Sequence, residues 1–420
     1  MLSKNEKIRL SCCSTKERRL TQVVSVKELK VVKSTLSKKT IDQLERLFVE
    51  GKWLYNYIVG LGVLGTEDMD WQKMKSVPVY NPLTNDWEER EFTTLKSSQR
   101  QAIYDRIIFN IRALHSLKMK GFEVGRLKFK SEMNSIPLKQ YGITHKFVSP
   151  TKIRIQGIKQ KLKVRGVEQI EGLELANAVL VRNCGDYYIK ITTFKDKDKI
   201  LKQNNGQSIA IDFGVKNSFT LSDGRTFNYS FEETGRIKRL QQKLSRQKKG
   251  SNNRRKTKER IKKAYQKLTN KKKEAANKFV AMISHYNRVC IQDEQLDSWK
   301  VEGSRARFNS KRIQHSILGQ VKSKLMSLPQ TVVLEKWIPT TQWCHVCGEK
   351  TKTQGSMFEC SCCGDSEDRD VHAAKNMLFI LENFIPVERR DFKLVEFESS
   401  CRKTKFLTMK QEDHRSLACD

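Results

Sequence analysis

The sequence predicts a multidomain protein that combines a small β-barrel with an α/β domain, and three observations lead to this prediction. Short segments of alternating apolar and polar residues follow one another from about residue 128 to residue 194, as in small barrels. A buried strand that ends in an acid, Ser208–Gly214, begins the α/β domain. Two Cys-x-x-Cys pairs inside that domain have the spacing of a zinc ribbon.

The composition indicates a folded protein that binds a polyanion. The chain has 420 residues, 38% of them hydrophobic, which is enough for two or three domains with their own cores. Its formal net charge of +34 is far from that of an ordinary enzyme and suits nucleic acid as a partner. No long apolar run and no signal peptide are visible, so we expect an intracellular protein that does not bind membranes.

The first two hundred residues are predicted to form the barrel, with a helical lobe inserted into it. The barrel segments are residues 1–36 and 128–200, and the lobe covers residues 37–127. In the lobe, one helix is expected to begin with Ser37 or Thr40 as its N-cap. Five aromatic residues are candidates for stacking on bases, although helical spacing favours a core position for Tyr55. They are Trp53, Tyr55, Tyr57, Trp71 and Trp87.

The α/β domain is predicted to open like an RNase H-like sheet. Its first strand carries Asp212 near its end, and two shorter strands follow, joined by the hairpin signal Asp223-Gly224. Two further buried strands, at residues 289–294 and 332–334, continue the domain. We therefore expect a sheet that begins with three antiparallel strands.

The most basic stretch of the chain, residues 236–278, is predicted to form two helices hinged at residues 250–253. A charge run is often only a solvated helix face, but such a density of like charge repels itself without counter-ions. We therefore expect contact with a polyanion. The candidate nucleic-acid-binding residues are Arg246, Lys248, Lys249, Arg254, Arg255, Lys256, Lys258 and Lys262.

The paired cysteines predict a structural zinc site. Each pair can form a tight turn that offers two sulfur atoms to one tetrahedral ion. The four predicted Zn²⁺ ligands are Cys344, Cys347, Cys360 and Cys363. Cys362 is an alternative ligand inside the second pair, and His345 and His372 are possible substitutes.

Three acids, Asp212, Glu294 and Asp370, stand at the ends of elements and could converge. Such a cluster can hold two Mg²⁺ ions about 4 Å apart for phosphodiester hydrolysis. Each acid also has a simpler explanation: Asp212 could cap a turn, Asp370 could be an N-cap, and Glu294 could lie on the surface beside Asp293. The acids Asp365, Glu367 and Asp368 are expected to have supporting or surface roles.

Together these motifs resemble the TnpB family of transposon-encoded, RNA-guided DNA endonucleases, whose architecture the smallest type V CRISPR effectors share. The sequences IAIDFGVKNSFTLSDG, IQDEQL and DRDVHAAKNM resemble the three RuvC motifs of the family, which implies that Asp212, Glu294 and Asp370 are the catalytic metal ligands. Asp293 is a neighbouring alternative for the second acid. The segments WIPTTQWCHVCG and FECSCCG resemble the family's zinc ribbon, and LQQKLSRQKKGSNNRRKTKERIKK resembles its basic helical pair.

The chain departs from the family pattern at two positions. His372 stands where Asn is common, and Ala210 stands where Gly is common. Neither change removes a metal ligand, and the full Asp-Glu-Asp set argues against the nuclease-inactive relatives. The resemblance implies a wedge domain (1–36 and 128–200), a recognition lobe (37–127), a RuvC-like domain (206–338 and 366–385), a zinc-ribbon target-nucleic-acid-binding insertion (339–365) and a charged tail open to disorder (386–420).

The resemblance also implies partners and cofactors: a guide RNA, double-stranded target DNA, two Mg²⁺ ions and Zn²⁺. It implies a prokaryotic cytoplasmic protein associated with the nucleoid, as a monomer or a dimer. Three alternatives stay open: a miniature type V CRISPR effector with the same chemistry, an RNA-guided DNA-binding regulator that does not cut, and a recombinase or junction nuclease without a guide.

Overall fold

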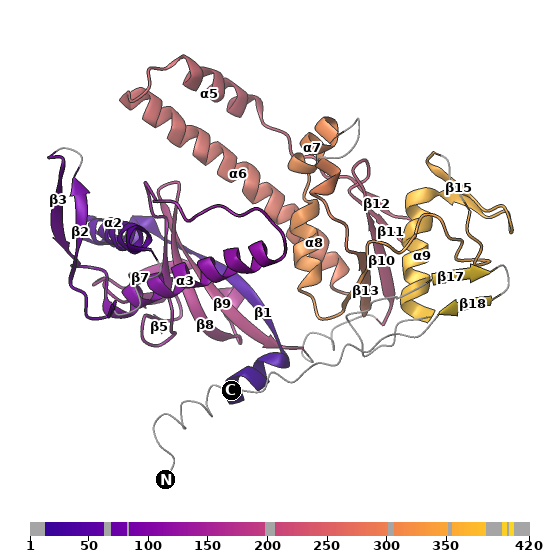
Figure 1. Ribbon diagram of the computed structural model, residues 1–420, viewed down its shortest axis with the longest axis horizontal. Coiled ribbons are helices and arrows are strands. Elements are labelled where there is room, and N and C mark those ends of the chain that lie inside the picture. Colours follow the sequence, from indigo (N-terminus) through magenta and orange to yellow (C-terminus); the bar gives the residue numbers. More distant parts are fainter. Residues whose placement is uncertain are drawn as a thin grey trace, which may run out of the picture. The chain divides into compact units, whose positions relative to one another are not determined.

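The computed structural model describes residues 13–62, 69–81, 84–197, 206–300, 306–351 and 355–383, and the backbone of residues 397–400 and 403–406 (Figure 1). The chain divides into two compact units, Met1–Lys195 and Asp196–Asp420. Each unit has a hydrophobic core of its own. Within these residues, no helix combines the length and the apolar character that crossing a membrane requires.

The first unit is built on a seven-stranded sheet. The strands are β1 (Gln22–Val31), β4 (Ser135–Leu138), β5 (His145–Ser149), β6 (Lys152–Ile155), β7 (Leu162–Arg165), β8 (Glu174–Asn183) and β9 (Asp186–Asp196), in the order β4-β8-β9-β1-β7-β6-β5. Strand β1 lies in the middle, so the N-terminal strand completes the sheet formed by the later segment, as predicted. Among the described residues, the edge strands β4 and β5 do not pair with each other, so the sheet is barrel-like but not closed.

The inserted lobe contains α2 (Lys38–Leu61), α3 (Ser97–Met119) and a hairpin of β2 (Ser76–Asn81) and β3 (Asp86–Glu91). Ser37 is the N-cap of α2, because its Oγ accepts a hydrogen bond from Thr40 N at 3.2 Å. Two short 3-10 helices, η1 (Lys33–Thr35) and η3 (Val167–Ile170), complete the unit.

The base-stacking prediction is wrong for Trp53 and Trp71, whereas the core position that helical spacing favoured for Tyr55 is confirmed. Trp53, Tyr55 and Trp71 are buried in the core of the first unit, and Tyr57 packs against it. The guanidinium groups of Arg46 and Arg90 lie over the ring of Trp53, so they occupy the position that a stacked base would need. Trp87, on β3, is 65% exposed and remains accessible.

The second unit has a five-stranded mixed sheet in the order β12-β11-β10-β13-β14. The strands are β10 (Ser208–Phe213), β11 (Phe219–Leu221), β12 (Thr226–Phe227), β13 (Arg288–Gln292) and β14 (Thr331–Leu334). Strands β10, β11 and β12 are antiparallel, and β13 and β14 run parallel to β10. The three antiparallel opening strands of an RNase H-like sheet are therefore present, with the turn at Gly224 in the left-handed region (φ +86°).

Helices cover both faces of this sheet (Figure 1). On one face lie α6 (Asn252–Ile283) and α8 (Leu318–Met326), and on the other lies α9 (Arg369–Asn383). The unit also contains α5 (Gly235–Arg246), η4 (Ser298–Lys300) and α7 (Ala306–His315). Ile209 and Ile211 of β10 pack with residues of α6 and α8, whereas Ala210 packs with residues of α9. The side chains of β10 thus alternate between the two helical layers.

The ribbon and the tail carry short strands that the sequence did not indicate. Strands β15 (Met357–Glu359) and β16 (Ser366–Asp368) form an antiparallel pair. In the tail, for which disorder was left open, the backbone of β17 (Phe397–Ser400) and β18 (Lys403–Phe406) forms a hairpin. Strands of three or four residues are too short for a period-two pattern to stand out. The remainder of the tail lies outside the described residues.

Candidate active site and metal centre

Asp212 lies on the face of the sheet that α9 covers. Asp212 is two residues after Ala210 on β10, so both side chains are on the same face of the sheet. Ala210 packs with Ala374 and Met377 of α9. Phe213 belongs to the core on the other face. Asp370 is in the first turn of α9. The strand and the helix therefore bring two of the three predicted acids to one place.

The three acids act on one another electrostatically. Burial raises the pKa of Asp212 well above its ordinary value, and the negative charge of Asp370, then that of Glu294, raises it further. The positive charge of Arg369 and the N–H of Phe213 oppose this shift. Like charges this close in a half-buried site are costly unless a proton or a cation compensates them.

Glu294 and its neighbour Asp293 have different surroundings. Burial raises the pKa of Glu294, while Lys322 opposes this and Asp293 adds to it. The Asp293 side chain is 54% exposed and forms an ion pair with Lys322 Nζ at 2.7 Å. The same Nζ donates to the backbone carbonyl of Glu294 at 2.7 Å. Glu294 is the acid whose charge acts on Asp212, whereas Asp293 is paired with Lys322.

Asp370 does not cap its helix. The Oδ1 of Asp368 accepts hydrogen bonds from the N–H groups of Asp370 at 2.9 Å and Val371 at 3.3 Å, which is the role of an N-cap. The simpler explanation of Asp370 as an N-cap is therefore wrong. Its carboxylate lies 3.5 Å from Arg369 Nη2 and faces the cluster.

The oxygen atoms of this cluster fit hard divalent cations. Carboxylates are the ligands that Mg²⁺ prefers, and a cation would relieve the repulsion that raises the pKa of Asp212. The role of the three acids as magnesium ligands remains a prediction.

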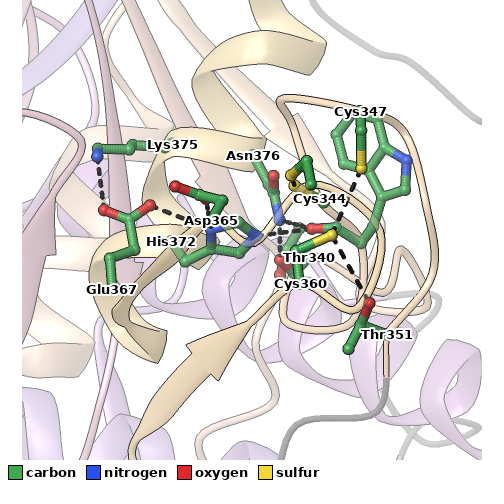
Figure 2. Close-up of polar contacts among 12 residues, drawn as sticks. Thr340, Cys344, Cys347, Thr351, Cys360, Asp365, Glu367, His372, Lys375 and Asn376 are labelled. Atoms are coloured by element: carbon green, nitrogen blue, oxygen red, sulfur yellow. Dashed lines mark hydrogen bonds and ion pairs between the residues drawn. The ribbon is translucent and has the colours of Figure 1, made fainter.

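The four predicted zinc ligands come together in the ribbon, and Figure 2 labels three of them, Cys344, Cys347 and Cys360. The sulfur atoms of Cys344 and Cys363 are 3.7 Å apart, those of Cys347 and Cys360 are 3.4 Å apart, and all four lie within 4.8 Å of one another. Tetrahedral Zn²⁺ with bonds of about 2.3 Å holds its sulfurs about 3.8 Å apart. The cluster therefore fits Zn²⁺. Cys362 is exposed and outside it, so the alternative with Cys362 as a ligand is wrong.

The backbone of the second cysteine turn favours a thiolate, the form that binds zinc. Burial opposes ionisation of Cys360, but the N–H groups of Cys363 and Cys362 lower its pKa to about 6. Burial raises the pKa of Cys344. A Zn²⁺ ion would overcome this second effect by its own charge.

His345 and His372 do not substitute for a cysteine. They form a second group with Asp365 and Glu367, whose potential ligand atoms also lie within 4.8 Å of one another. This group was not predicted from the sequence, because the two acids were interpreted as supporting or surface residues. The sequence signal that could have indicated this group is that His345 directly follows Cys344.

Seven of the eight predicted nucleic-acid-binding residues are exposed on α5, α6 and the turn between them. Arg254 differs, because it is half-buried and its Nη1 donates to the carbonyls of Leu244 and, at 2.9 Å, Gln247. These are carbonyls at the end of α5, so Arg254 also holds the hinge together. In Figure 1, α5 folds back along α6.

Two family models match the second unit. Residues 193–293 match the model of the OrfB family of IS605, described as a probable transposase. Residues 321–377 match the model of the Cas12f1-like TNB domain, which includes the cysteine cluster.

Two curated relatives are named as nucleases. A putative RNA-guided DNA endonuclease of Streptomyces pristinaespiralis is 27% identical over 178 residues, which cover 41% of this chain and 44% of that protein. The putative RNA-guided DNA endonuclease InsQ of Escherichia coli K12 is 27% identical over 242 residues, which cover 52% of this chain and 59% of InsQ. The chain thus spans about half the length of these relatives. A solved Cas12f1–sgRNA–target DNA complex aligns over 81% of this chain and 83% of that chain, with 12% identity and a TM-score of 0.41.

Proposed function

We propose that this chain, whose residues 193–293 and 321–377 carry the domains of the TnpB family and of its Cas12f1-like relatives, is an RNA-guided DNA endonuclease. The observation that carries the proposal is the placement of Asp212 on the sheet face that α9 covers, with Asp370 in the first turn of that helix. The charges of Asp370 and Glu294 both act on Asp212. Three acids from a central strand, the end of a parallel strand and a helix start suit a nuclease better than a structural role.

In this proposal the three acids hold two Mg²⁺ ions. When bound, the ions would activate water and stabilise the leaving 3′ oxygen, which gives 5′-phosphate and 3′-hydroxyl ends. Strand β10 places Asp212 on the face of the sheet that α9 covers, and bound cations would favour the ionised form of its carboxyl group. Asp368 fixes the first turn of α9 and thereby leaves the Asp370 carboxylate free for the cluster.

The basic helices are proposed to hold the guide RNA through its phosphates, because their charged side chains are exposed and repeat along two adjoining helices. The wedge domain and recognition lobe would recognise a short motif beside the target, and the ribbon would contact the target nucleic acid. Pairing of guide and target would open an R-loop and supply the sequence specificity.

The test compares variants of three acids: Asp212, Glu294 and its neighbour Asp293. The guide is first identified by sequencing the RNA that copurifies with the protein. With that guide and Mg²⁺, we expect Asp212→Ala and Glu294→Gln to lose DNA cleavage and keep RNA binding. Asp293→Asn is the matched control and should keep cleavage, since Asp293 faces Lys322. Full cutting by Asp212→Ala would overturn the proposal.

A miniature type V CRISPR effector with the same chemistry is the second candidate, favoured by the match to the Cas12f1-like TNB domain. A copurifying RNA transcribed from a neighbouring repeat array would support it. RNA-independent cutting would instead indicate a nuclease without a guide.

A further inference from the structure

We propose that His345, Asp365, Glu367 and His372 form a second zinc site, with nitrogen and oxygen ligands, between the ribbon and the start of α9. One potential ligand atom from each residue lies within 4.8 Å of the others. Figure 2 shows Asp365 and Glu367 on the same side of His372, apart from the cysteine sulfurs. The group is distinct from both the cysteine cluster and the three nuclease acids.

The distances suit a tetrahedral ion. His372 Nδ1 lies 3.1 Å from Glu367 Oε1 and 3.6 Å from Asp365 Oδ2. Bonds of about 2.0–2.1 Å from Zn²⁺ to nitrogen or oxygen hold tetrahedral ligand atoms about 3.3 Å apart. The two observed separations bracket that value, and every other pair of potential ligand atoms lies within 4.8 Å and would close toward it around an ion.

The hydrogen bonds of His372 leave its Nδ1 facing acceptors. Its Nε2 lies 2.8 Å from the carbonyl oxygen of Trp343, which can only accept, so Nε2 carries a proton. In the neutral ring, Nδ1 then has a lone pair, and this lone pair faces two carboxylates. The His372 side chain is fully buried, so water cannot relieve the repulsion. Either a proton, on Nδ1 or on a carboxyl group, or a metal ion must lie between these atoms.

Two further buried atoms favour the metal. His345 Nδ1 and Asp365 Oδ2 have no hydrogen-bond partner among the residues that the structure describes. A proton on His372 Nδ1 would serve Glu367 at 3.1 Å and leave both of these atoms unsatisfied. A tetrahedral ion can take one atom from each of the four residues. Two imidazoles and two carboxylates are ligands that Zn²⁺ accepts.

The surroundings hold the ligands as they do in known metal sites. The Trp343 carbonyl fixes the His372 tautomer, and Lys375 Nζ donates to Glu367 Oε2 at 2.5 Å. The Phe358 ring stacks on His372 with centroids 3.5 Å apart and excludes water from that face. Four protein ligands close a zinc site, which makes it structural.

Such a site would join the ribbon to the nuclease sheet. His345 belongs to the first cysteine turn, whereas His372 lies in α9 two residues after Asp370. The ion would therefore fix the start of α9 against the ribbon and hold the Asp370 carboxylate in place.

The test is the zinc content of the full chain, measured by mass spectrometry after dialysis against metal-free buffer. We expect two zinc ions per chain in the wild type and one in His345→Ala and in Asp365→Asn. His285→Ala is the matched control, since His285 is an exposed histidine of the same unit, and it should keep two.

Cobalt substitution separates the two sites. Thiolate-to-cobalt absorption comes only from the cysteine cluster, so His345→Ala should lose one cobalt without losing this absorption. Should His345→Ala lose both ions because the ribbon unfolds, Asp365→Asn decides. One zinc per wild-type chain, or an unchanged content in Asp365→Asn, would overturn the proposal. Neither measurement involves cleavage, so the result is independent of the proposed nuclease activity.

Discussion

Glu50 is a buried carboxylate of α2 that joins this helix to residues 93–95, which follow the β2–β3 hairpin. Its side chain is 0% exposed and accepts hydrogen bonds from the N–H groups of Thr93, Thr94 and Leu95 and from Arg46 Nε. Burial alone would raise its pKa, but Arg46 and these donors lower it overall. The carboxylate is thus ionised and satisfied on both oxygens.

We expect Glu50→Gln to destabilise the protein by roughly 2–4 kcal/mol, because the new NH₂ group faces N–H donors in a buried site. The midpoint of urea unfolding measures this change. Glu89→Gln is the control, since Glu89 is an exposed strand residue, and it should shift stability by less than about 0.5 kcal/mol. Equal midpoints for the two variants would contradict the assigned role of Glu50.

His145 makes the stability of the first unit depend on pH. It is buried on β5, and burial lowers its pKa from 6.5 to about 4, against a hydrogen bond to the Ala176 backbone. The unfolded chain therefore takes up this proton at higher pH than the folded chain. Stability is complete above about pH 6.5 and falls as the pH drops to about 4, by up to about 3 kcal/mol.

This prediction can be checked by urea unfolding at several pH values between 4 and 7. His145→Gln should lose most of the pH dependence, while His115→Gln, which changes an exposed histidine, should retain it. A wild-type curve that is flat from pH 7 to pH 4.5 would exclude the effect.

The basic helix pair α5–α6 is the element from which nucleic-acid binding can be tested. Lys248, Lys249, Arg255 and Lys258 are exposed at the turn and on the first turns of α6. If they bind phosphates, replacing all four with Gln should weaken RNA binding and reduce the slope of log K against log[salt] by about 0.7 for each phosphate that is no longer neutralised. Filter binding at several salt concentrations measures both.

The matched control exchanges Lys and Arg at the same four positions, which keeps the charge and should keep the slope. Arg254→Ala is expected to act differently, through the hinge, because its guanidinium group binds backbone carbonyls at the end of α5. A quadruple Gln variant with an unchanged slope would show that the guide lies elsewhere.

Elements with a strong local pattern could be predicted from the sequence. Helix α6 has both an apolar stripe and an N-cap, Ser251, which lies within the expected hinge, and Asp223-Gly224 forms the expected turn. These features depend on neighbours along the chain, so the sequence contains all the necessary information. Strand β16 does not depend on near neighbours, because it forms by pairing with β15. Its acids had been interpreted only as supporting or surface residues.

The positions of the three acids at the ends of elements allowed their convergence, and the family resemblance then implied it. No spacing rule brings Asp212 to Asp370, because their approach depends on β10 facing α9. His345 and His372 lie close together for a similar reason, because the ribbon folds onto α9. No sequence motif predicted this contact. His372, which departs from the common Asn of the family, is thus explained by its neighbours Glu367 and Trp343.

At the scale of the whole molecule, each unit has core residues of its own. The core of residues 1–195 gathers around Phe48, Trp71 and Tyr187, whereas that of the second unit lies on both faces of the β10–β14 sheet. Separate cores are the condition for separate cooperative units. Zinc bound in the ribbon would supply folding free energy to the second unit, because Trp343 belongs both to the ribbon and to the core under α9.

We therefore expect zinc removal and Glu50→Gln to affect different parts of the chain. Hydrogen exchange followed by mass spectrometry should show that a strong chelator reduces protection in residues 339–383 and leaves residues 22–61 unchanged. Glu50→Gln should do the reverse, since its hydrogen bonds all lie in the first unit. The Cys362→Ser variant, which alters an exposed cysteine outside the cluster, should behave as the wild type in both respects. If each perturbation instead lowered protection equally throughout the chain, the two units would unfold as one, and the cores would not be independent.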